Sequence, residues 1–406
     1  MLKEKLRQKM RMFKSFKNIF LKDKLEIIQQ RRNQVIKFLD DAISNRLIDD
    51  TIMNELGSSF SMLKREGNKI KKFSIKKEGK SKIIDELNWY LICRKNMSDS
   101  AYKSFLPEIF DYSINQNNPY YVMKYYPYPS LRTLVFEYRL KKGQILKIVE
   151  SVIRSLINNM YSIKMAIDTP SDYVEVTHFK KLKERIDSAV KMRPALKNLM
   201  EKNTININGK SYLNVKILMD AIFNDKKIMQ KLKPPKLWII HGDVHYSNIL
   251  CSVITNKNIL VDCRGRSPYG TVQCDVAMDI GKLCHEFRSY YSFIERKEYT
   301  LFVHETPQKV IVNFNFRNDG VKKIYDDLIG DIEKLLNRYF DVKKFGNWKY
   351  RSEFIEGKHF ISMLPFHTED ESESIACFII GIMRLNEWLK KYHPGLYEKL
   401  KRKYSI

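Results

Sequence analysis

The chain has 406 residues, which is enough to bury a large core and to build a two-lobed protein with an extension. A hydrophobic share of 44% with 12% aromatic residues excludes a wholly disordered chain. The net charge of +26 indicates acidic partners, such as phosphorylated substrates, nucleic acid or an anionic membrane surface, although lysine is abundant throughout the sequence.

Membrane spans and disulfides are not expected. No apolar run approaches the roughly 18 residues of a spanning helix, and the first ten residues lack the apolar core of a secretory signal. The six cysteines form no C-x-x-C pair, which favours reduced thiols over a zinc site. We therefore expect a cytoplasmic protein.

Residues 1–50 predict a basic amphipathic helical extension. Apolar side chains recur there at helical spacing, with lysines and arginines between them and no proline or glycine. Such a helix can lie on an anionic membrane, here through residues 1–35, which would make the protein peripheral at the inner membrane face. It can equally pack its apolar stripe on the rest of the protein. No specific nucleic-acid binding is expected.

Residues 51–128 predict a small lobe rich in strands. Turn-forming Glu66-Gly67-Asn68 separates two short runs with strand character, and Asn115-Gln116-Asn117-Asn118-Pro119 separates two more. A helix with one apolar face lies between these hairpins. The expected strands are 58–64, 69–75, 105–114 and 120–126, and the expected helix is 81–93.

Residues 129–406 predict a larger and mainly helical lobe. Pro127 and Pro129 end the preceding sheet, and Ser130 is the expected N-cap of the next helix. Residues 205–215 contain a short turn at Asn208-Gly209. The expected helices are 144–165, 179–200, 217–232, 283–294, 319–340 and 376–392, and strands are expected within 299–316.

The segment from Leu237 to Leu283 contains the candidate catalytic and metal-binding residues. A short apolar strand runs into His-Gly-Asp, and Asn248 follows Asp243 by five positions. A hairpin of strands 249–254 and 258–261 then brings Asp262 back beside Asn248. A carboxylate that orients a hydroxyl, together with two oxygen ligands for Mg²⁺, suits phosphoryl transfer. Asp243 is the candidate base, with metal held by the other two; alternatively, these polar residues only cap a hairpin.

The residues HGDVHYSNIL, VDCRG and CDVAMDIGKL resemble the aminoglycoside and choline kinase-like phosphotransferase family, especially its bacterial capsule- and surface-glycan-associated members. The resemblance implies an α+β, two-lobed protein kinase-like fold, with a small β-rich N-lobe, a larger helical C-lobe and the basic N-terminal extension. It also implies ATP, Mg²⁺ and a small-molecule hydroxyl acceptor, with a catalytic loop at 241–248 and a metal segment at 262–265.

The same resemblance assigns nucleotide contacts to the small lobe. A strand lysine would meet the phosphates: Lys72 is favoured over Lys71, because Lys71 shares its face with Phe73. Glu86 would pair with that lysine. Lys124 departs from the family, whose members often have an acidic residue there. The remaining expected contacts are phosphate contacts from Ser58 and Ser59 and backbone contacts to adenine at Met123 and Tyr125.

Other charged residues of the loop receive supporting roles. His241 and Asp279 are expected to support the catalytic loop, and Asp279 is not expected to contact metal. Arg264 and Arg266 follow the metal aspartate, and the guanidinium of either suits phosphate oxygens, of the reacting phosphoryl group or of an acceptor. Arg264 is the candidate catalytic group of the two. His245 could reach a phosphate or the acceptor, but it is expected to be an exposed loop histidine.

We therefore expect an ATP- and Mg²⁺-dependent kinase that acts on a small hydroxyl compound, with a sugar or glycan precursor favoured. A choline- or aminoglycoside-type kinase is an alternative, although polycationic aminoglycosides match so basic a chain poorly. A second alternative is a kinase-like scaffold that binds an anionic membrane or nucleic acid without efficient catalysis.

Overall fold

The structure, a computed structural model, describes residues 61–252, 255–306, 309–366 and 370–405. The chain divides into two compact units, Met1–Ser58 with Met62–Arg65, and Ser59–Ser61 with Glu66–Ile406. Strand β1 (Met62–Glu66) is the described element that lies almost wholly in the first unit. The helical extension expected at residues 1–50 lies outside the described residues, and the following paragraphs concern the second unit.

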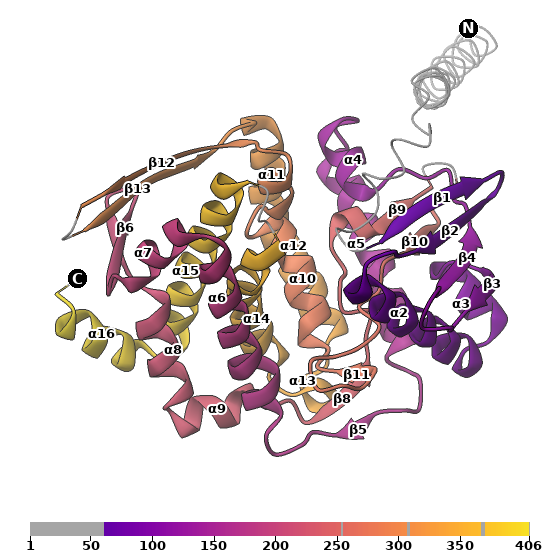
Figure 1. Ribbon diagram of the computed structural model, residues 1–406, viewed down its shortest axis with the longest axis horizontal. Coiled ribbons are helices and arrows are strands. Elements are labelled where there is room, and N and C mark those ends of the chain that lie inside the picture. The colour runs from indigo at the N-terminus through magenta and orange to yellow at the C-terminus, as the bar shows by residue number, and fades with distance from the viewer. Residues whose placement is uncertain (1–60, 253–254, 307–308, 367–369, 406) are drawn as a thin grey trace, which may run out of the picture. The chain divides into compact units, whose positions relative to one another are not determined.

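Three antiparallel strands and two helices form the small lobe of this unit. The strands are β2 (Lys69–Phe73), β3 (Ile109–Ser113) and β4 (Tyr120–Lys124), with β4 in the middle, and the helices are α2 (Lys77–Asn96) and α3 (Asp99–Phe105). Helix α2 buries its apolar face, including Ile83 and Leu87, in the core. The register sets Lys72 opposite Tyr121, so the Lys72 side chain lies on the buried side of the sheet. Figure 1 shows these elements in indigo and purple.

The expected strand 105–114 is shorter than predicted. Residues 99–105 form α3 instead, because the Ser98 side chain caps the helix by accepting a hydrogen bond from the Ala101 N–H at 3.2 Å. The strand begins only at Ile109. The helix predicted at 81–93 is confirmed within α2.

Helices make up most of the larger lobe (Figure 1). Ser130 caps its first helix as predicted, accepting from the Thr133 N–H at 3.1 Å. The helices are α4 (Leu131–Phe136), α5 (Lys142–Ser155), α6 (Lys181–Met192), α7 (Pro194–Glu201), α8 (Val215–Phe223), α9 (Lys226–Leu232), α10 (Ala277–Phe287), α11 (Tyr291–Glu295), α12 (Asp319–Tyr339), α13 (Val342–Phe345), α14 (Trp348–Met363), α15 (Glu371–Tyr392) and α16 (Pro394–Lys403). Wider turns continue the helical path at Leu156–Met160 and precede α6 at Glu175–Lys180, and a 3₁₀ turn covers Leu364–Phe366.

Three helices that the sequence predicted as continuous are interrupted. Pro194 has no N–H to donate, so the helix expected at 179–200 becomes α6 and α7. Asp225 caps α9 through the N–H groups of Lys227 and Ile228, which divides the helix expected at 217–232. Tyr290 adopts a φ of 54° between α10 and α11.

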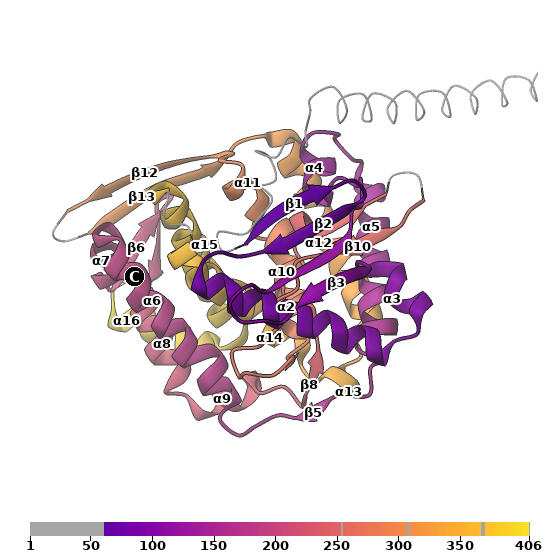
Figure 2. The ribbon, with the colours of Figure 1, turned by 45° about the vertical axis from the view of Figure 1, so that its right-hand side comes forward.

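Short sheets complete the larger lobe. Strand β8 (Lys236–Ile239) lies between β5 (Ile167–Asp168) and β11 (Gln273–Cys274), and β9 (Ile249–Cys251) pairs with β10 (Asn258–Leu260) in the predicted hairpin. A further sheet has the order β12-β13-β6-β7, from β12 (Tyr299–Glu305), β13 (Val310–Phe316), β6 (Thr204–Ile207) and β7 (Lys210–Leu213). Figures 1 and 2 show the long β12–β13 ribbon at the edge of this lobe.

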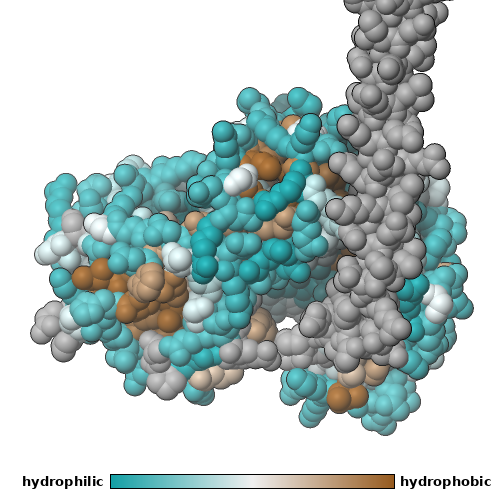
Figure 3. All heavy atoms as spheres, turned by 90° about the horizontal axis from the view of Figure 1, so that it is seen from above, coloured by the Kyte–Doolittle hydropathy of each residue, from teal (hydrophilic) through white to brown (hydrophobic). Residues whose placement is uncertain are grey.

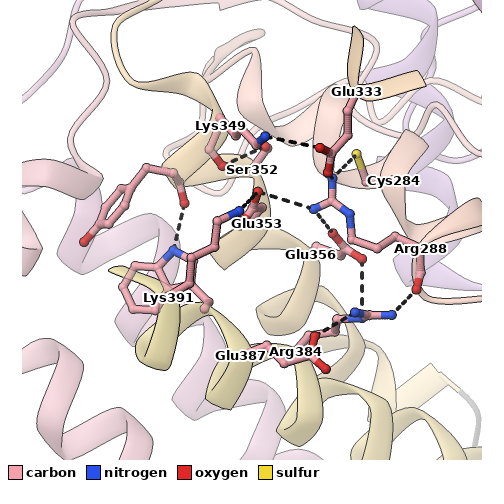
Figure 4. Close-up of polar contacts among 12 residues, drawn as sticks. Cys284, Arg288, Glu333, Lys349, Ser352, Glu353, Glu356, Arg384, Glu387 and Lys391 are labelled. Carbon is pink, nitrogen blue, oxygen red and sulfur yellow. Dashed lines mark hydrogen bonds and ion pairs between the residues drawn. The ribbon is translucent and has the colours of Figure 1, made fainter. Parts of the chain in front are cut away.

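A network of carboxylates surrounds Arg288, a largely buried cation of the helical lobe. The Arg288 guanidinium lies 3.1 Å from Glu356, 3.4 Å from Glu333 and 3.8 Å from Glu353 (Figure 4). Arg384 pairs with Glu387 and Lys391 with Glu353 in the same network. Because a buried charge is costly without a partner, these carboxylates offset the cost of burying the Arg288 guanidinium.

The predicted fold class is confirmed: a small lobe built on a sheet precedes a larger, mainly helical lobe. All six cysteines are buried with free thiols. In the described part of the chain, no helix has the length and apolar character to cross a bilayer. Figure 3 shows one face of the molecule, which is largely hydrophilic, with apolar side chains gathered in a few patches.

Candidate active site

The loop that follows β8 is held by one buried carboxylate. Asp279, on α10, accepts hydrogen bonds from the N–H groups of His241 and Gly242 at 3.0 and 2.6 Å, and from the Tyr161 hydroxyl at 2.8 Å. Burial raises the pKa of Asp279 to about 6, against the lowering effect of these hydrogen bonds. Asp279 therefore fixes the backbone at the start of the 241–248 loop.

Glycine is required where this loop passes Arg264. Gly242 has a φ of +82°, and a Cβ atom there would lie 2.7 Å from the Arg264 Cβ. The Arg264 N–H donates to the His241 carbonyl at 2.8 Å, which joins the two segments. The His241 ring is fully buried and packs edge-on against Trp89, and burial lowers its pKa to about 4.

The structure brings Asp243, Asn248 and Asp262 together. Asn248 Nδ2 donates to the Asp243 carbonyl at 3.0 Å and lies 3.5 Å from the Asp243 carboxylate. The hairpin returns the chain as predicted, with the Val261 N–H donating to the Asn248 carbonyl at 3.0 Å. Asp262 follows directly and adopts a φ of 61°, an uncommon conformation that is often found at functional positions.

Lys72 joins the small lobe to this group. Its Nζ donates to Glu86 Oε2 at 2.8 Å and also to Asp262 Oδ1, and the Tyr121 hydroxyl donates to the same Glu86 oxygen at 2.9 Å. Burial alone would lower the pKa of Lys72, but Asp262 and Glu86 hold it above its ordinary value. Lys71 lies on the other face, with its Nζ 3.9 Å from the centre of the Tyr120 ring.

The carboxylate of Asp262 is ionised at neutral pH. Burial would raise its pKa, but the charges of Lys72 and Lys82 lower it to about 2. Asp262 offers a carboxylate and Asn248 a side-chain amide oxygen, and the backbone pairing of Val261 with Asn248 brings the two residues into one region. This set fits Mg²⁺, which takes oxygen ligands and keeps several waters.

Basic side chains surround the Asp243 carboxylate. Lys282 Nζ lies 3.0 Å from Asp243 Oδ1, and His245 Nε2 lies 3.8 Å from Oδ2. Partial burial alone would raise the pKa of Asp243. The charges of Lys282, His245 and Arg264 outweigh this effect and hold that pKa well below its usual range.

The expectation that His245 is exposed is wrong. Its side chain is 12% exposed, and its Nδ1 lies 3.7 Å from the buried Glu286. Glu286 also accepts from the Tyr246 N–H at 2.9 Å and from the Ser292 hydroxyl at 2.6 Å. Glu286 therefore holds the backbone of the 241–248 loop in addition to Asp279.

Lys282 and Glu286 are site residues that the sequence reasoning missed. Every residue of α10 is buried, yet Asp279, Lys282 and Glu286 are charged and fall on one helical face at i, i+3 and i+7. Charged side chains on one face of an otherwise apolar helix were the available signal, because buried charges need a partner or a function.

The nucleotide-base contacts expected in the small lobe are placed only in part. Met123 is buried on β4. The Tyr125 N–H donates to the Asn68 carbonyl at 2.8 Å, so that group is already engaged within the protein and is not open to adenine. Ser58 and Ser59 lie outside the described residues.

Comparisons with known proteins give structural likenesses alone. No protein-family model and no curated relative matches the sequence. An ADP-bound aminoglycoside phosphotransferase, APH(2'')-Ib, is 10% identical over 81% of this chain and 90% of its own, with a TM-score of 0.44. A choline/ethanolamine kinase family protein from Mesorhizobium loti is 12% identical over 90% of this chain and 99% of its own, with a TM-score of 0.40.

Another similar structure is the GDP complex of a variant aminoglycoside 2'-phosphotransferase-IIIa. It is 11% identical over 84% of this chain and 91% of its own, with a TM-score of 0.38.

Proposed function

We propose that this chain is a phosphotransferase of the aminoglycoside and choline kinase-like type, which transfers the γ-phosphoryl group of ATP to a hydroxyl of a small molecule. The observation that supports the proposal is the position of the Lys72 ammonium between Glu86 and Asp262, with Asp243 and Asn248 beside them. Phosphoryl transfer needs this set: a phosphate-binding cation, oxygen ligands for a metal and a carboxylate for the hydroxyl.

Each residue has a defined task in this proposal. Lys72 binds phosphate oxygens, and Glu86 orients it. Asn248 and Asp262 would hold Mg²⁺, which neutralises charge on the phosphates when it is bound. The loop backbone that carries Asp243 is fixed by Asp279, so the hydroxyl and the phosphate can be held in line.

The chemical step exchanges one bond to phosphorus for another. The acceptor oxygen bonds to the γ-phosphorus while the bond from that phosphorus to the β,γ-bridging oxygen breaks and ADP leaves. Asp243 accepts a hydrogen bond from the hydroxyl and takes its proton. Because the pKa of Asp243 is held low, the carboxylate is a weak base that mainly orients the hydroxyl. When phosphoryl transfer passes through a loose transition state, little proton removal by the protein is needed.

The sequence resemblance favours a sugar-type acceptor, in the biosynthesis of a capsule or another surface glycan. The net charge of +26 matches polycationic aminoglycosides poorly. We also propose a cytoplasmic location. Contact of residues 1–35 with an anionic membrane stays a prediction, because those residues lie outside the described part of the chain.

The proposal is tested by measuring ADP release by the full chain with ATP, Mg²⁺ and a panel of sugars, amino alcohols and nucleotide sugars. Asp243→Asn should lower kcat about 10²- to 10⁴-fold, whereas Asp220→Asn, at an exposed position on α8, should not change it. Equal ADP release by the Asp243 variant would contradict the assigned role. Absence of any nucleotide binding, together with salt-sensitive binding to anionic vesicles, would instead favour a scaffold.

A further inference from the structure

Basic side chains from four segments meet next to Asp243. We call this group the basic cluster: Arg185 on α6, Arg264 after β10, Lys282 on α10, and Lys358 and His359 on α14. Lys282 Nζ lies 3.0 Å from Asp243 Oδ1, the Arg264 Cβ borders Gly242 next to Asp243, and α14 packs against both α10 and α6. The charge of Arg264 also acts on Arg185 and Lys358, and the charge of Lys282 acts on His359. The cluster therefore adjoins the place where the hydroxyl would bind.

The Lys358 ammonium is buried without a carboxylate. The residue is 2% exposed, and its Nζ donates to the Thr177 carbonyl at 3.0 Å and lies 3.1 Å from His178 Nδ1. Within residues 61–405, apart from the undescribed gaps, no acidic side chain pairs with it. Burial and the charge of Arg264 lower the pKa of Lys358 to about 7. This differs from Arg288 in the same lobe, which has three glutamates around it (Figure 4).

The acidic side chains near the basic cluster already pair with other cations. Asp275 binds Arg351 in a bidentate pair at 2.6 and 3.0 Å. Glu184, on the same helix as Arg185, lies 3.5 Å from Lys181. Among the described residues, only Asp243 contacts a member of the cluster through a carboxylate, and it is assigned to the hydroxyl.

His359 adds a second, independent indication of a ligand. The residue is 3% exposed, and in the described part of the chain neither of its ring nitrogens has a hydrogen-bond partner. Burial and the charges of Lys282 and Lys358 hold its pKa well below its ordinary value, so the ring is neutral and offers one N–H donor. Buried polar groups are nearly always hydrogen-bonded, and a ligand would supply the missing partner.

Arg264 is the member of the basic cluster that is exposed to solvent. The residue is exposed, and its guanidinium makes no hydrogen bond or ion pair with the described residues. A guanidinium can bind a carboxylate or a phosphate through two parallel hydrogen bonds. It therefore suits an anion that approaches from solvent, and its charge also acts on Lys358.

We propose that the acceptor carries an anionic group, a carboxylate or a phosphate, which binds Arg264 and Lys358 and receives the His359 N–H while the acceptor hydroxyl meets Asp243. This inference rests on the proposed function and names its substrate class. The anionic group takes no part in the bond exchange and serves to position the hydroxyl. An acceptor with an ammonium group at this place would meet like charges and bind poorly.

The inference is tested with a matched series of sugars: glucose, glucosamine, glucuronic acid and glucose 6-phosphate. Calorimetry on the full chain with Mg²⁺ and ADP should show that at least one of the two acids binds at least tenfold more tightly than glucose and that glucosamine binds more weakly than glucose. The two acids distinguish a carboxylate from a phosphate. Equal binding of glucose and the acids, or no binding of either acid, overturns the inference.

Two variants and a matched control locate the binding. Arg264→Gln and Lys358→Met should each weaken binding of the preferred acid at least tenfold, whereas Arg266→Gln should not. Arg266 is exposed two positions further along and donates to the Gly270 carbonyl at 3.0 Å, outside the cluster. Equal effects of the two arginine variants overturn the inference. Circular dichroism verifies that the Lys358 variant is folded, and Arg264→Gln keeps the test decisive if it is not.

Failure of the inference is distinguishable from failure of the proposed function. Mg²⁺-dependent binding of ATP, measured without any sugar, reports on the nucleotide and metal site of Lys72, Asn248 and Asp262 and not on the basic cluster. A chain that binds ATP with Mg²⁺ but prefers neutral or aminated sugars keeps the proposed function and loses the anionic acceptor.

Discussion

Replacing Lys358 by methionine is expected to stabilise the protein most where the buried ammonium is protonated. The side chain is 2% exposed, has no carboxylate partner among the described residues, and has its pKa lowered from 10.5 to about 7. Methionine has a similar length and removes the charge. It also removes the hydrogen bond to Thr177, which offsets part of the gain at every pH.

The magnitude follows from proton linkage. Between pH 7 and 10.5 the unfolded chain binds the Lys358 proton and the folded chain does not, so the stability of the wild type rises with pH in this window and falls as the pH drops through 7. One pKa unit corresponds to about 1.4 kcal/mol. Between pH 7 and 9, the wild type should therefore gain about 2 kcal/mol relative to Lys358→Met.

Urea unfolding of both proteins at pH 7 and at pH 9 measures this difference. His178, Lys181 and Cys274 also act on or contact Lys358, so each comparison is made between variants at the same pH. The control is Lys349→Met on the same helix, whose ammonium lies 3.3 Å from Glu333. A difference between wild type and Lys358→Met that stays constant from pH 7 to 9 would refute the reasoning that this lysine is buried and unpaired.

Three further changes test the site. Lys282→Met removes a charge that lowers the pKa of Asp243, so the acid limb of the kcat–pH profile should move to higher pH. In the same assay, kcat should fall about tenfold. An acid limb at the same pH in both proteins would contradict the effect of Lys282 on Asp243. Gly265→Ala would place a Cβ atom 2.4 Å from the backbone of α2, at a φ of +73°. The free energy of unfolding, measured by urea titration, should therefore fall by about 1–3 kcal/mol. Unchanged stability would argue against this close approach. Glu86→Gln removes the buried negative charge beside Lys72 and should weaken ATP binding about tenfold in calorimetry, because an amide oxygen orients the ammonium less well than a carboxylate. Equal affinity would contradict the orienting role of Glu86.

The local part of the site could be predicted because it is encoded over few residues. Asp243, Asn248 and Asp262 lie within one loop and one hairpin, and the turn residues between the strands indicate how the chain returns. The choice of Lys72 over Lys71 followed from strand alternation, and the two side chains do lie on opposite faces.

Features that depend on distant segments could not be predicted in the same way. Lys358 is far from Asp243 in the sequence, and only the packing of α14 against α10 brings it into the basic cluster. Parallel pairing of β13 with β6 joins residues more than a hundred positions apart, which no local pattern indicates. The division at Pro194, by contrast, was available from the sequence, because proline cannot donate within a helix.

The most direct test of the central claim is a calorimetric titration of ATP into the full chain, with and without Mg²⁺, for the wild type and for Asp262→Asn. If Lys72, Asn248 and Asp262 form the nucleotide and metal site, Mg²⁺ should tighten ATP binding to the wild type at least tenfold and should have little effect on the variant. ATP binding that is independent of Mg²⁺, or equal in the two proteins, would contradict the site as described.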